Sequence, residues 1–323
     1  MYHITALGEL LIDFTESGVS KAGMKLFEQN PGGAVANVLA AAARLGEQTA
    51  FIGEVGNDMH GAFLKETLEN AGIDTKGLVM SDEFFTTLAF VALSASGERT
   101  FSFARKPGAD TQLTAEEVDE SILQSTEILH VGSLSLTDEP ARSATHHAVK
   151  LAKKHGAAIS YDPNYRASLW PDVETAKTRM RELLPYMDVM KLSDEETALL
   201  TDMESPAEAA KRLNSMGISC VAVTLGKQGA LVSVDGNSKI VPGYPLPAID
   251  TTGAGDAFWG GFLHRMLSLK KRLDELTLDE AADCAAWGNA VATCCVQKRG
   301  AIPAMPWLSE VLELMREYGR YTT

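Results

Sequence analysis

Residues 250–263 read DTTGAGDAFWGGFL, a stretch that joins a glycine turn, an acid and the start of an apolar helix. The apolar pattern continues to Met266 and predicts a helix over residues 253–269. Glycines at its start let the backbone approach a ligand closely and turn successive N–H groups toward one point. Because these N–H groups lie at the positive end of a helix dipole, the stretch predicts an anion site.

Asp256 stands in the first turn of this helix, where a carboxylate can accept a proton from a nucleophile that attacks a bound phosphoryl group. An ordinary turn followed by an acid that the helix dipole favours would have the same pattern, so both interpretations stay open. The dinucleotide spacing G-x-G-x-x-G/A is excluded because Phe258 occupies the third small position. The Walker A pattern is excluded because Gly226-Lys227 is followed by Gln228.

Around this stretch, short apolar runs alternate with helical patterns along the chain. The candidate strands are residues 4–7, 50–55, 128–132, 157–162, 189–192, 220–225 and 230–234. The candidate helices are residues 34–45, 59–70, 139–155, 175–184, 206–216, 253–269 and 278–297. This alternation predicts an α/β fold, with a mainly parallel, doubly wound sheet between helices and with ligands beyond the carboxyl ends of the strands.

Two segments, residues 10–30 and 84–106, break the alternation and have no helical periodicity. The second has the pattern of a β-hairpin with a Ser-Ala-Ser-Gly turn at residues 94–97. Such segments form either an extra edge of the main sheet or a small lid, and we expect the lid. No linker, repeat or low-complexity tract divides the chain, so residues 1–323 are expected to form a single domain with this appendage.

Composition limits the partners. The 323 residues carry a formal net charge of −14, which disfavours nucleic acid or an anionic membrane surface as the main partner. A local nest of N–H groups still allows ATP with its Mg²⁺. No apolar run is long enough to span a membrane, and the first residues do not resemble a signal peptide. The four cysteines form no C-x-x-C pair, which predicts reduced thiols in a cytoplasmic protein.

Two motifs together resemble the PfkB (ribokinase-like) family of carbohydrate kinases. Residues 250–263 match the C-terminal signature of that family, and residues 31–37, PGGAVAN, resemble the N-terminal one. Val35 departs from the N-terminal signature, where a small residue or proline is usual. The elements between the two motifs follow the family order. The resemblance therefore covers essentially the whole chain and implies a three-layer α/β/α sandwich with a mainly parallel central sheet and a small β-strand lid.

The resemblance also implies roles for individual residues. Asp256 would be the base that takes the proton of a sugar hydroxyl. The backbone N–H groups of the three preceding residues would bind the transferring phosphoryl oxygens, namely Gly253, Ala254 and Gly255. The sugar would lie against Asp13, Gly32, Gly33 and Asn37. A turn residue at position 13, a helix entry at 32–33 and a capping role at 37 are the structural alternatives.

For the nucleotide, residues 224–229 resemble the T-x-G-x-x-G loop of the family, and residues 193–196 its N-x-x-E motif with serine in place of asparagine. The nucleotide residues so implied are Ser193, Glu196, Thr224, Gly226, Gly229 and Asn289. A strand–turn–strand hairpin and a helix start capped by Ser193 would explain the same stretches. Backbone oxygens around Asp250, Thr252 and Gly300 resemble a monovalent-cation loop. The implied cofactors are ATP and Mg²⁺, with K⁺ as an additional ion.

Residues 101–110, FSFARKPGAD, resemble a fructokinase pattern in which alanine here replaces a tyrosine. Phe103, Arg105 and, after the strand at 157–162, Arg166 are therefore candidate sugar or phosphate ligands. Lid packing and solvated surface charges are the structural alternatives. We expect fructose as substrate, with 2-keto-3-deoxygluconate, another furanose or a nucleoside as rivals. A non-catalytic sugar or nucleotide sensor and a dehydrogenase are the functional alternatives. Because lids of this family often pair, a homodimer is a further expectation.

Overall fold

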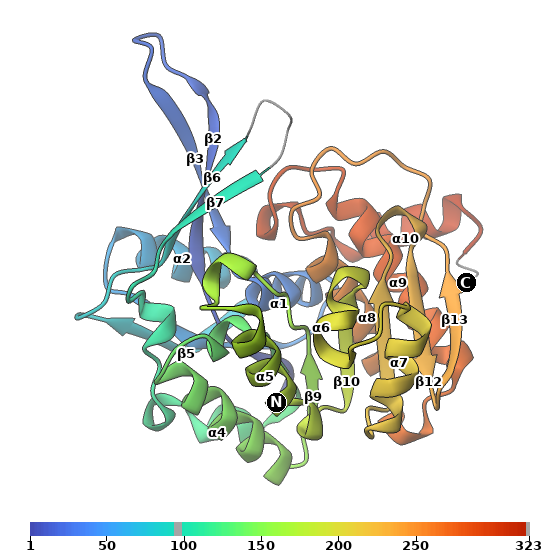
Figure 1. Ribbon diagram of the computed structural model, residues 1–323. Coiled ribbons are helices and arrows are strands. Elements are labelled where there is room, and N and C mark those ends of the chain that lie inside the picture. The colour runs from blue at the N-terminus through green and yellow to red at the C-terminus, as the bar shows by residue number, and fades with distance from the viewer. Residues whose placement is uncertain (94–98, 321–323) are drawn as a thin grey trace.

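The computed structural model describes residues 1–93 and 99–320 (Figure 1). Its main sheet has nine strands in the order β13-β12-β11-β10-β9-β8-β1-β4-β5. They are β1 (Tyr2–Leu7), β4 (Thr49–Gly56), β5 (Ile73–Ser81), β8 (Thr126–Val131), β9 (Ala158–Tyr161), β10 (Val189–Ser193), β11 (Cys220–Thr224), β12 (Ala230–Val234) and β13 (Asn237–Val241). All neighbours from β5 to β11 are parallel, and β12 and β13 are antiparallel at one edge. The predicted mainly parallel sheet is confirmed.

Helices cover both faces of this sheet. One apolar cluster joins it to α1 (Ala34–Arg44), α2 (Met59–Asn70), α8 (Ala254–Ser268), α9 (Leu278–Cys295) and α10 (Leu308–Glu317). The other joins it to α3 (Glu120–Gln124), α4 (Ala141–Lys154), α5 (Val173–Glu182) and α7 (Pro206–Ser215). The short α6 (Thr197–Thr201) follows β10. Side chains alternate between the faces along a strand, so Ala6 and the next residue, Leu7, belong to different clusters. The result is a three-layer α/β/α sandwich.

A second, four-stranded sheet projects from the sandwich in the order β3-β2-β6-β7 (Figure 1). Its strands are β2 (Leu11–Val19), β3 (Lys25–Gly32), β6 (Leu88–Leu93) and β7 (Arg99–Ala104). They come from the two segments that lacked helical periodicity. The two sheets are separate, so the alternative of an extra edge of the main sheet is wrong. That this second sheet acts as a lid stays a prediction.

Among the strands of the main sheet and the helices named above, five were not predicted: β5, β13, α3, α6 and α10. The edge strand β5, IDTKGLVMS, lacks both a clean alternation and a continuous apolar run, and a register shift interrupts its pairing with β4. In the described part of the chain, none of the helices combines the length and apolar character that crossing a membrane requires.

Helix α8 is packed against α1 and α9 through glycines. A Cβ built on Gly260 would lie 2.5 Å from the Cβ of Ala41 and 2.8 Å from the carbonyl oxygen of Val38. On the other side, a Cβ on Gly288 of α9 would lie 2.6 Å from the carbonyl oxygen of Phe258. The missing side chains let these helix backbones approach each other, and this approach sets the position of the first turn of α8.

We therefore expect Gly260→Ala to destabilise the protein although alanine is the better helix former. Propensity favours alanine by about 1 kcal/mol, whereas overpacking costs about 1–3 kcal/mol. One of the clashing atoms is a backbone atom, the carbonyl oxygen of Val38, which cannot move aside easily. The cost of overpacking should therefore exceed the gain from helix propensity. Urea unfolding measures the change in the free energy of unfolding. The exposed helical substitution Glu66→Ala is the control, with a change within about 0.5 kcal/mol. A Gly260→Ala protein as stable as the parent would contradict the close approach of α8 and α1.

Candidate active site

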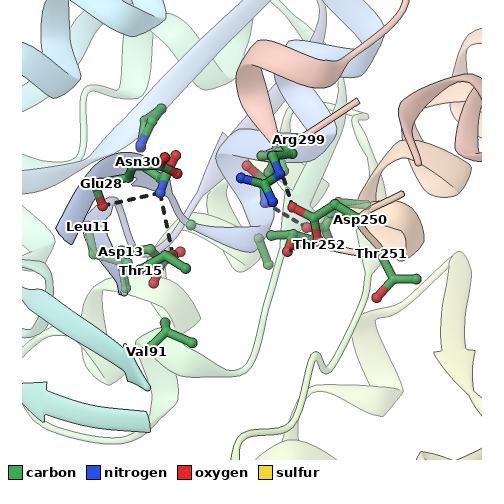
Figure 2. Close-up of a pocket in the computed structure, with 18 of the residues that line it drawn as sticks. Leu11, Asp13, Thr15, Glu28, Asn30, Val91, Asp250, Thr251, Thr252 and Arg299 are labelled. Atoms are coloured by element: carbon green, nitrogen blue, oxygen red, sulfur yellow. Dashed lines mark hydrogen bonds between the residues drawn. The ribbon is translucent and has the colours of Figure 1, made fainter. Parts of the chain in front are cut away.

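A cavity of about 450 Å³ lies between the second sheet and the start of α8. Figure 2 shows Asp13, Thr15 and Asn30 of the second sheet on one side and Asp250, Thr252 and Arg299 on the other. The remaining polar lining comes from segments far apart in sequence: Glu9, Glu16, Ser17, Glu28, Asn37, Asn164, Arg166, Thr251 and Asp256. The cavity therefore forms only when the two sheets and α1 and α8 are assembled.

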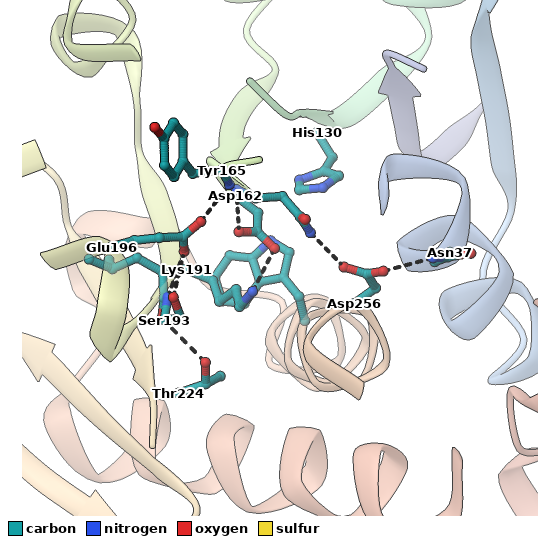
Figure 3. Close-up of polar contacts among 12 residues, drawn as sticks. Asn37, His130, Asp162, Tyr165, Lys191, Ser193, Glu196, Thr224 and Asp256 are labelled. Carbon is teal, nitrogen blue, oxygen red and sulfur yellow. Dashed lines mark hydrogen bonds and ion pairs between the residues drawn. The ribbon is translucent and has the colours of Figure 1, made fainter. Parts of the chain in front are cut away.

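Asp256 lies in the wall of this cavity with 6% of its surface exposed. The side-chain amide of Asn37 donates a 2.7 Å hydrogen bond to its Oδ2, and the amide of Asn164 donates a 3.0 Å hydrogen bond to its Oδ1 (Figure 3). Burial raises the pKa of Asp256 to about 6; Lys191 lowers it, Asp162 raises it, and Asn37 and Arg166 lower it. The carboxyl group is thus oriented on both sides, and its pKa lies close to neutrality, as suits a proton acceptor.

The turn before Asp256 needs glycine for two reasons. Gly253 has the left-handed conformation (φ 74) at the N-terminal cap of α8, and its Cβ would lie 2.8 Å from that of Ala301. A Cβ on Gly255 would lie 3.0 Å from the Nζ atom of the buried Lys191. With Ala254, whose N–H donates to the carbonyl oxygen of Thr251 at 3.2 Å, these residues form the N-terminal end of α8, where backbone N–H groups lack intrahelical acceptors.

Of the predicted sugar-side residues, Asp13, Gly33 and Asn37 line the cavity, and Gly32 lies next to the Asp13 carboxylate. Asp13 of β2 is paired with Asn30 of β3, and a Cβ on Gly32, two residues further along β3, would be 2.4 Å from the Asp13 Oδ2 atom. Gly33 has a φ of 126, and its Cβ would be 2.4 Å from the carbonyl oxygen of Glu9. Only glycine at 32 leaves room for the Asp13 carboxylate. The buried Oδ1 atom of Asn37 makes no hydrogen bond within residues 1–93 and 99–320.

Glu9 was missed by the sequence reasoning. Its side chain, 1% exposed, accepts a 2.7 Å hydrogen bond through Oε1 from the backbone N–H of Ala34, at the start of α1. Its Oε2 atom is buried and has no hydrogen-bond partner among the described residues, and burial raises the pKa of Glu9 to about 7. Its place two residues after the end of β1, near a carboxyl strand end, was the available signal.

The two candidate arginines differ in position. Arg166 is exposed and lines the cavity, as predicted, and its Nη1 donates to the carbonyl oxygen of Tyr165 at 3.0 Å. Arg105 is 6% exposed and is not part of the cavity lining. Its guanidinium donates to Asp110, Thr137 and the Leu134 carbonyl at 2.7, 2.8 and 2.9 Å.

Because these protein acceptors occupy its donors, Arg105 supports the loop after β7 here and does not face the cavity. Phe103, the third residue predicted from this segment, lines the cavity.

The predicted nucleotide residues lie apart from this cavity. Figure 3 shows Ser193, Glu196 and Thr224 on the opposite side of Asp256 from Asn37. Glu196 accepts hydrogen bonds from the N–H (2.8 Å) and hydroxyl (3.1 Å) of Ser193, the capping arrangement that was the structural alternative. Gly226 and Gly229 have φ values of 54 and 102 in the turn from β11 to β12.

Asn289 of α9 donates its amide to the carbonyls of Val241 and Pro242 at 3.0 and 3.3 Å. These contacts place Asn289 beside the end of β13, and they occupy the amide donors that a nucleotide would otherwise use.

The three residues predicted around a cation are held together by one carboxylate. Asp250 accepts through Oδ1 from the N–H and hydroxyl of Thr252 at 3.0 and 2.7 Å, and through Oδ2 from the N–H of Gly300 at 3.1 Å. These bonds fix the turn before α8 against the loop after α9. No cluster of three or more His, Cys, Asp or Glu side chains suited to a metal ion occurs in the described ranges.

Comparison with known proteins gives one consistent result. Residues 1–308 match the model of the pfkB family carbohydrate kinases. The chain is 41% identical over 316 residues to Fructokinase-1 of Oryza sativa subsp. japonica, and 40% identical over 317 residues to Fructokinase-2 of Solanum lycopersicum. These matches cover 97% of this chain, and 97% and 96% of the respective relatives.

Solved structures agree. A fructokinase from Xylella fastidiosa with bound ATP has a TM-score of 0.89 and 34% identity, covering 98% of this chain and 99% of that one. A fructokinase from Vibrio cholerae O395 with bound fructose, ADP and calcium ion has a TM-score of 0.87 and 34% identity, covering 97% and 98%.

The turn before α8 yields a stability prediction. Gly253→Ala should lose about 1–2 kcal/mol through left-handed strain and about 1–3 kcal/mol more through the contact with Ala301. Gly72→Ala is the matched control, because Gly72 has a similar φ of 84 with nothing within 4 Å of the added Cβ. Urea unfolding of both variants separates strain from crowding. Equal losses would show that the turn has room for a side chain.

Proposed function

The chain belongs to the pfkB family of carbohydrate kinases, and we propose that it transfers the γ-phosphate of ATP to a primary hydroxyl of fructose, giving fructose 6-phosphate. The observation that carries this proposal is the buried Asp256, held by two amides in the wall of a polar cavity and at the start of α8. Relatives and solved structures named fructokinases, over nearly the whole chain, support fructose as the acceptor.

The sugar occupies the cavity between the second sheet and α8. The Asp13 carboxylate and the Asn37 amide oxygen, which has no protein partner in the described residues, accept hydrogen bonds from sugar hydroxyls. Gly32 and Gly33 let the sugar lie against backbone. The second sheet acts as a lid over the sugar and reduces access of water to the reacting groups. Phe103 and Val91 contribute apolar surface to the same wall.

Asp256 accepts the proton of the attacking hydroxyl. As the bond forms between the sugar oxygen and the γ-phosphorus, the bond from that phosphorus to the β,γ-bridging oxygen breaks and ADP leaves. The hydroxyl proton passes to the Asp256 carboxylate. The N–H groups of residues 253–255 and the positive end of α8 stabilise the charge on the phosphoryl oxygens.

The nucleotide lies on the side of Asp256 where Figure 3 shows Glu196 and Thr224, close to the turn after β11 that contains Gly226. Mg²⁺ neutralises phosphate charge when it is bound. In the described ranges there is no cluster of three carboxylates to hold it, so the ion would reach the site on the phosphates, with water and few side-chain oxygens as its remaining ligands. For K⁺, we propose the backbone oxygens around Asp250, Thr252 and Gly300, which the Asp250 carboxylate holds together.

Two wider expectations are part of the proposal. Val19, Phe27 and Phe90 of the second sheet expose 64%, 41% and 39% of their surface, which supports pairing of this sheet in a homodimer. The four cysteines are free thiols, which supports a reducing compartment such as the cytoplasm.

Asp256→Asn should lower kcat by about 10²–10⁴-fold, because the amide cannot accept the proton. Sugar affinity, measured by calorimetry, should change little, since Asp13 and Asn37 remain.

A coupled ADP-release assay with fructose, 2-keto-3-deoxygluconate, ribose and a nucleoside measures turnover and identifies the acceptor. The exposed Asp279→Asn is the control. Parental turnover in Asp256→Asn would refute the base, and no turnover of the parent with any sugar would favour a sensor.

The raised pKa of Asp256 predicts an acid limb in the pH–rate profile. The base works when it is ionised, so kcat/KM should fall about tenfold per pH unit below about 6 and level off above it. Glu9 also has a raised pKa, of about 7, and lies in the same cavity, so Glu9→Gln is the matched control and should keep the limb. If Glu9→Gln loses the acid limb of the pH–rate profile, that limb reports the ionisation of Glu9 and not of Asp256.

A further inference from the structure

We propose that Lys191, Asp162 and Asn164 form a positioning device for Asp256, in which a buried ion pair holds the amide that orients the base and sets the charge around it. The proposal rests on the role of Asp256 as the base. None of these three residues was assigned a role from the sequence. Figure 3 shows Asp162 and Lys191 on the opposite side of Asp256 from Asn37, and Asn164 lines the sugar cavity.

The first link is the ion pair. Lys191 of β10 donates from Nζ to the Oδ2 atom of Asp162 at 2.8 Å, and the two residues are 5% and 2% exposed. Asp162 directly follows β9, and β9 and β10 are neighbouring parallel strands, so the sheet itself brings the two side chains together. Asp162 lies at the carboxyl end of β9 and Lys191 two residues before the end of β10, so the pair lies close to the edge of the sheet at which ligands bind.

The second link runs from Asp162 to the base. The Oδ1 atom of Asp162 accepts from the backbone N–H of Asn164 at 3.3 Å. Asn164 has a left-handed backbone (φ 46), which asparagine tolerates better than most residues. From this conformation its side-chain amide donates to Asp256 Oδ1 at 3.0 Å. The carboxylate that accepts the hydrogen bond from the Lys191 ammonium group therefore also holds the backbone of Asn164, whose amide binds Asp256.

Stability alone does not explain such a pair. Removing two charges from water costs several kcal/mol per ion, and a well-packed apolar pair in the same place is often equally or more stable. The position of the Lys191 ammonium group supports a role for its positive charge instead. The Nζ atom lies against the first turn of α8, 3.0 Å from where a Cβ on Gly255 would be. Glycine at 255 thus leaves space for an ammonium group directly beside the base.

The charges facing Asp256 come from several elements. Lys191 of β10 and Arg166 of the loop after β9 favour its ionised form, and Asp162 opposes it. Cys295 of α9 also lies within electrostatic range, and burial raises the pKa of this thiol to about 12, so it stays neutral. Burial lowers the pKa of His130, which lies near Lys191, to about 3, so this ring is neutral as well.

Glu196 adds to the negative charge around Lys191. Burial lowers the pKa of Lys191, but Asp162, Glu196 and Asp256 together outweigh burial and raise it. The ammonium group therefore stays charged in the working pH range of the base.

The two members of the pair should affect the base in opposite directions. Lys191→Met removes a positive charge, so the acid limb of the pH–rate profile should move to higher pH. Asp162→Asn removes a negative charge, so the limb should move to lower pH. Each shift should be on the order of one pH unit. A purely structural pair would not produce shifts of opposite sign.

The test uses Lys191→Met, Asp162→Asn, the double variant and Asn164→Ala. The acid limb of kcat/KM for fructose is compared with the ¹³C carboxyl NMR titration of Asp256, which needs no turnover. Asn164→Ala should lower kcat by about 10–100-fold, because a small misplacement of a reacting group is costly, and should raise the pKa of Asp256 by removing a donor to its ionised form. The half-exposed ion pair of Lys153 and Asp188 gives the control: Lys153→Met should change neither readout.

The double variant keeps the test valid if a single variant fails to fold, because it leaves no buried charge without a partner. Its acid limb should lie between those of the single variants. Shifts in the same direction, or lower stability with an unmoved limb, would overturn the positioning device while leaving the kinase proposal intact. Parental turnover in Asp256→Asn would instead refute the assignment of Asp256 as the base. Failure of the positioning device and failure of the kinase mechanism can therefore be told apart.

Discussion

The structure depends on one buried carboxylate, Asp256, that is held from both sides. Asn37 comes from α1, 219 residues earlier in the chain, and Asn164 comes from the loop after β9, 92 residues earlier. Burying an ionised carboxylate is unfavourable unless donors and charges offset the lost water. The two amides and the nearby Lys191 supply that offset and still leave the pKa at about 6. The rest of the fold brings these donors to one point.

The parallel sheet and the glycines in its covering helices provide that convergence. Strands β1, β8, β9 and β10 are neighbours and point the same way, so the residues that follow them meet at one edge. Helix α8 then has to lie close to α1 and α9, which Gly260 and Gly288 allow. A glycine has the same effect at the cavity, where the missing side chain of Gly32 leaves room for the Asp13 carboxylate. Backbone approach therefore decides the distances between functional groups.

Charge is distributed unequally over the site. The sugar side is rich in acceptors, among them Asp13, Glu9 and the Asn37 amide oxygen, which suits a ligand that presents many hydroxyl donors. Arg166 and Arg299 supply the positive charge of the cavity lining. The start of α8 lies between these regions, where a transferred phosphoryl group would find N–H donors on one side and its acceptor hydroxyl on the other.

The sequence by itself determined the α/β alternation, the presence of the helix predicted over residues 253–269 and the glycine turn with Asp256, because these depend on local periodicity and backbone freedom. It did not reveal the edge strands β5 and β13, whose pairing depends on neighbours distant in the chain. Arg105 and Arg166 looked equivalent as ligands, and only packing turned the first toward Asp110 and left the second in the cavity. Glu9, Asn164 and Lys191 stayed hidden for the same reason. A side chain's role as donor, acceptor or counter-charge depends on which distant residue the tertiary structure places against it.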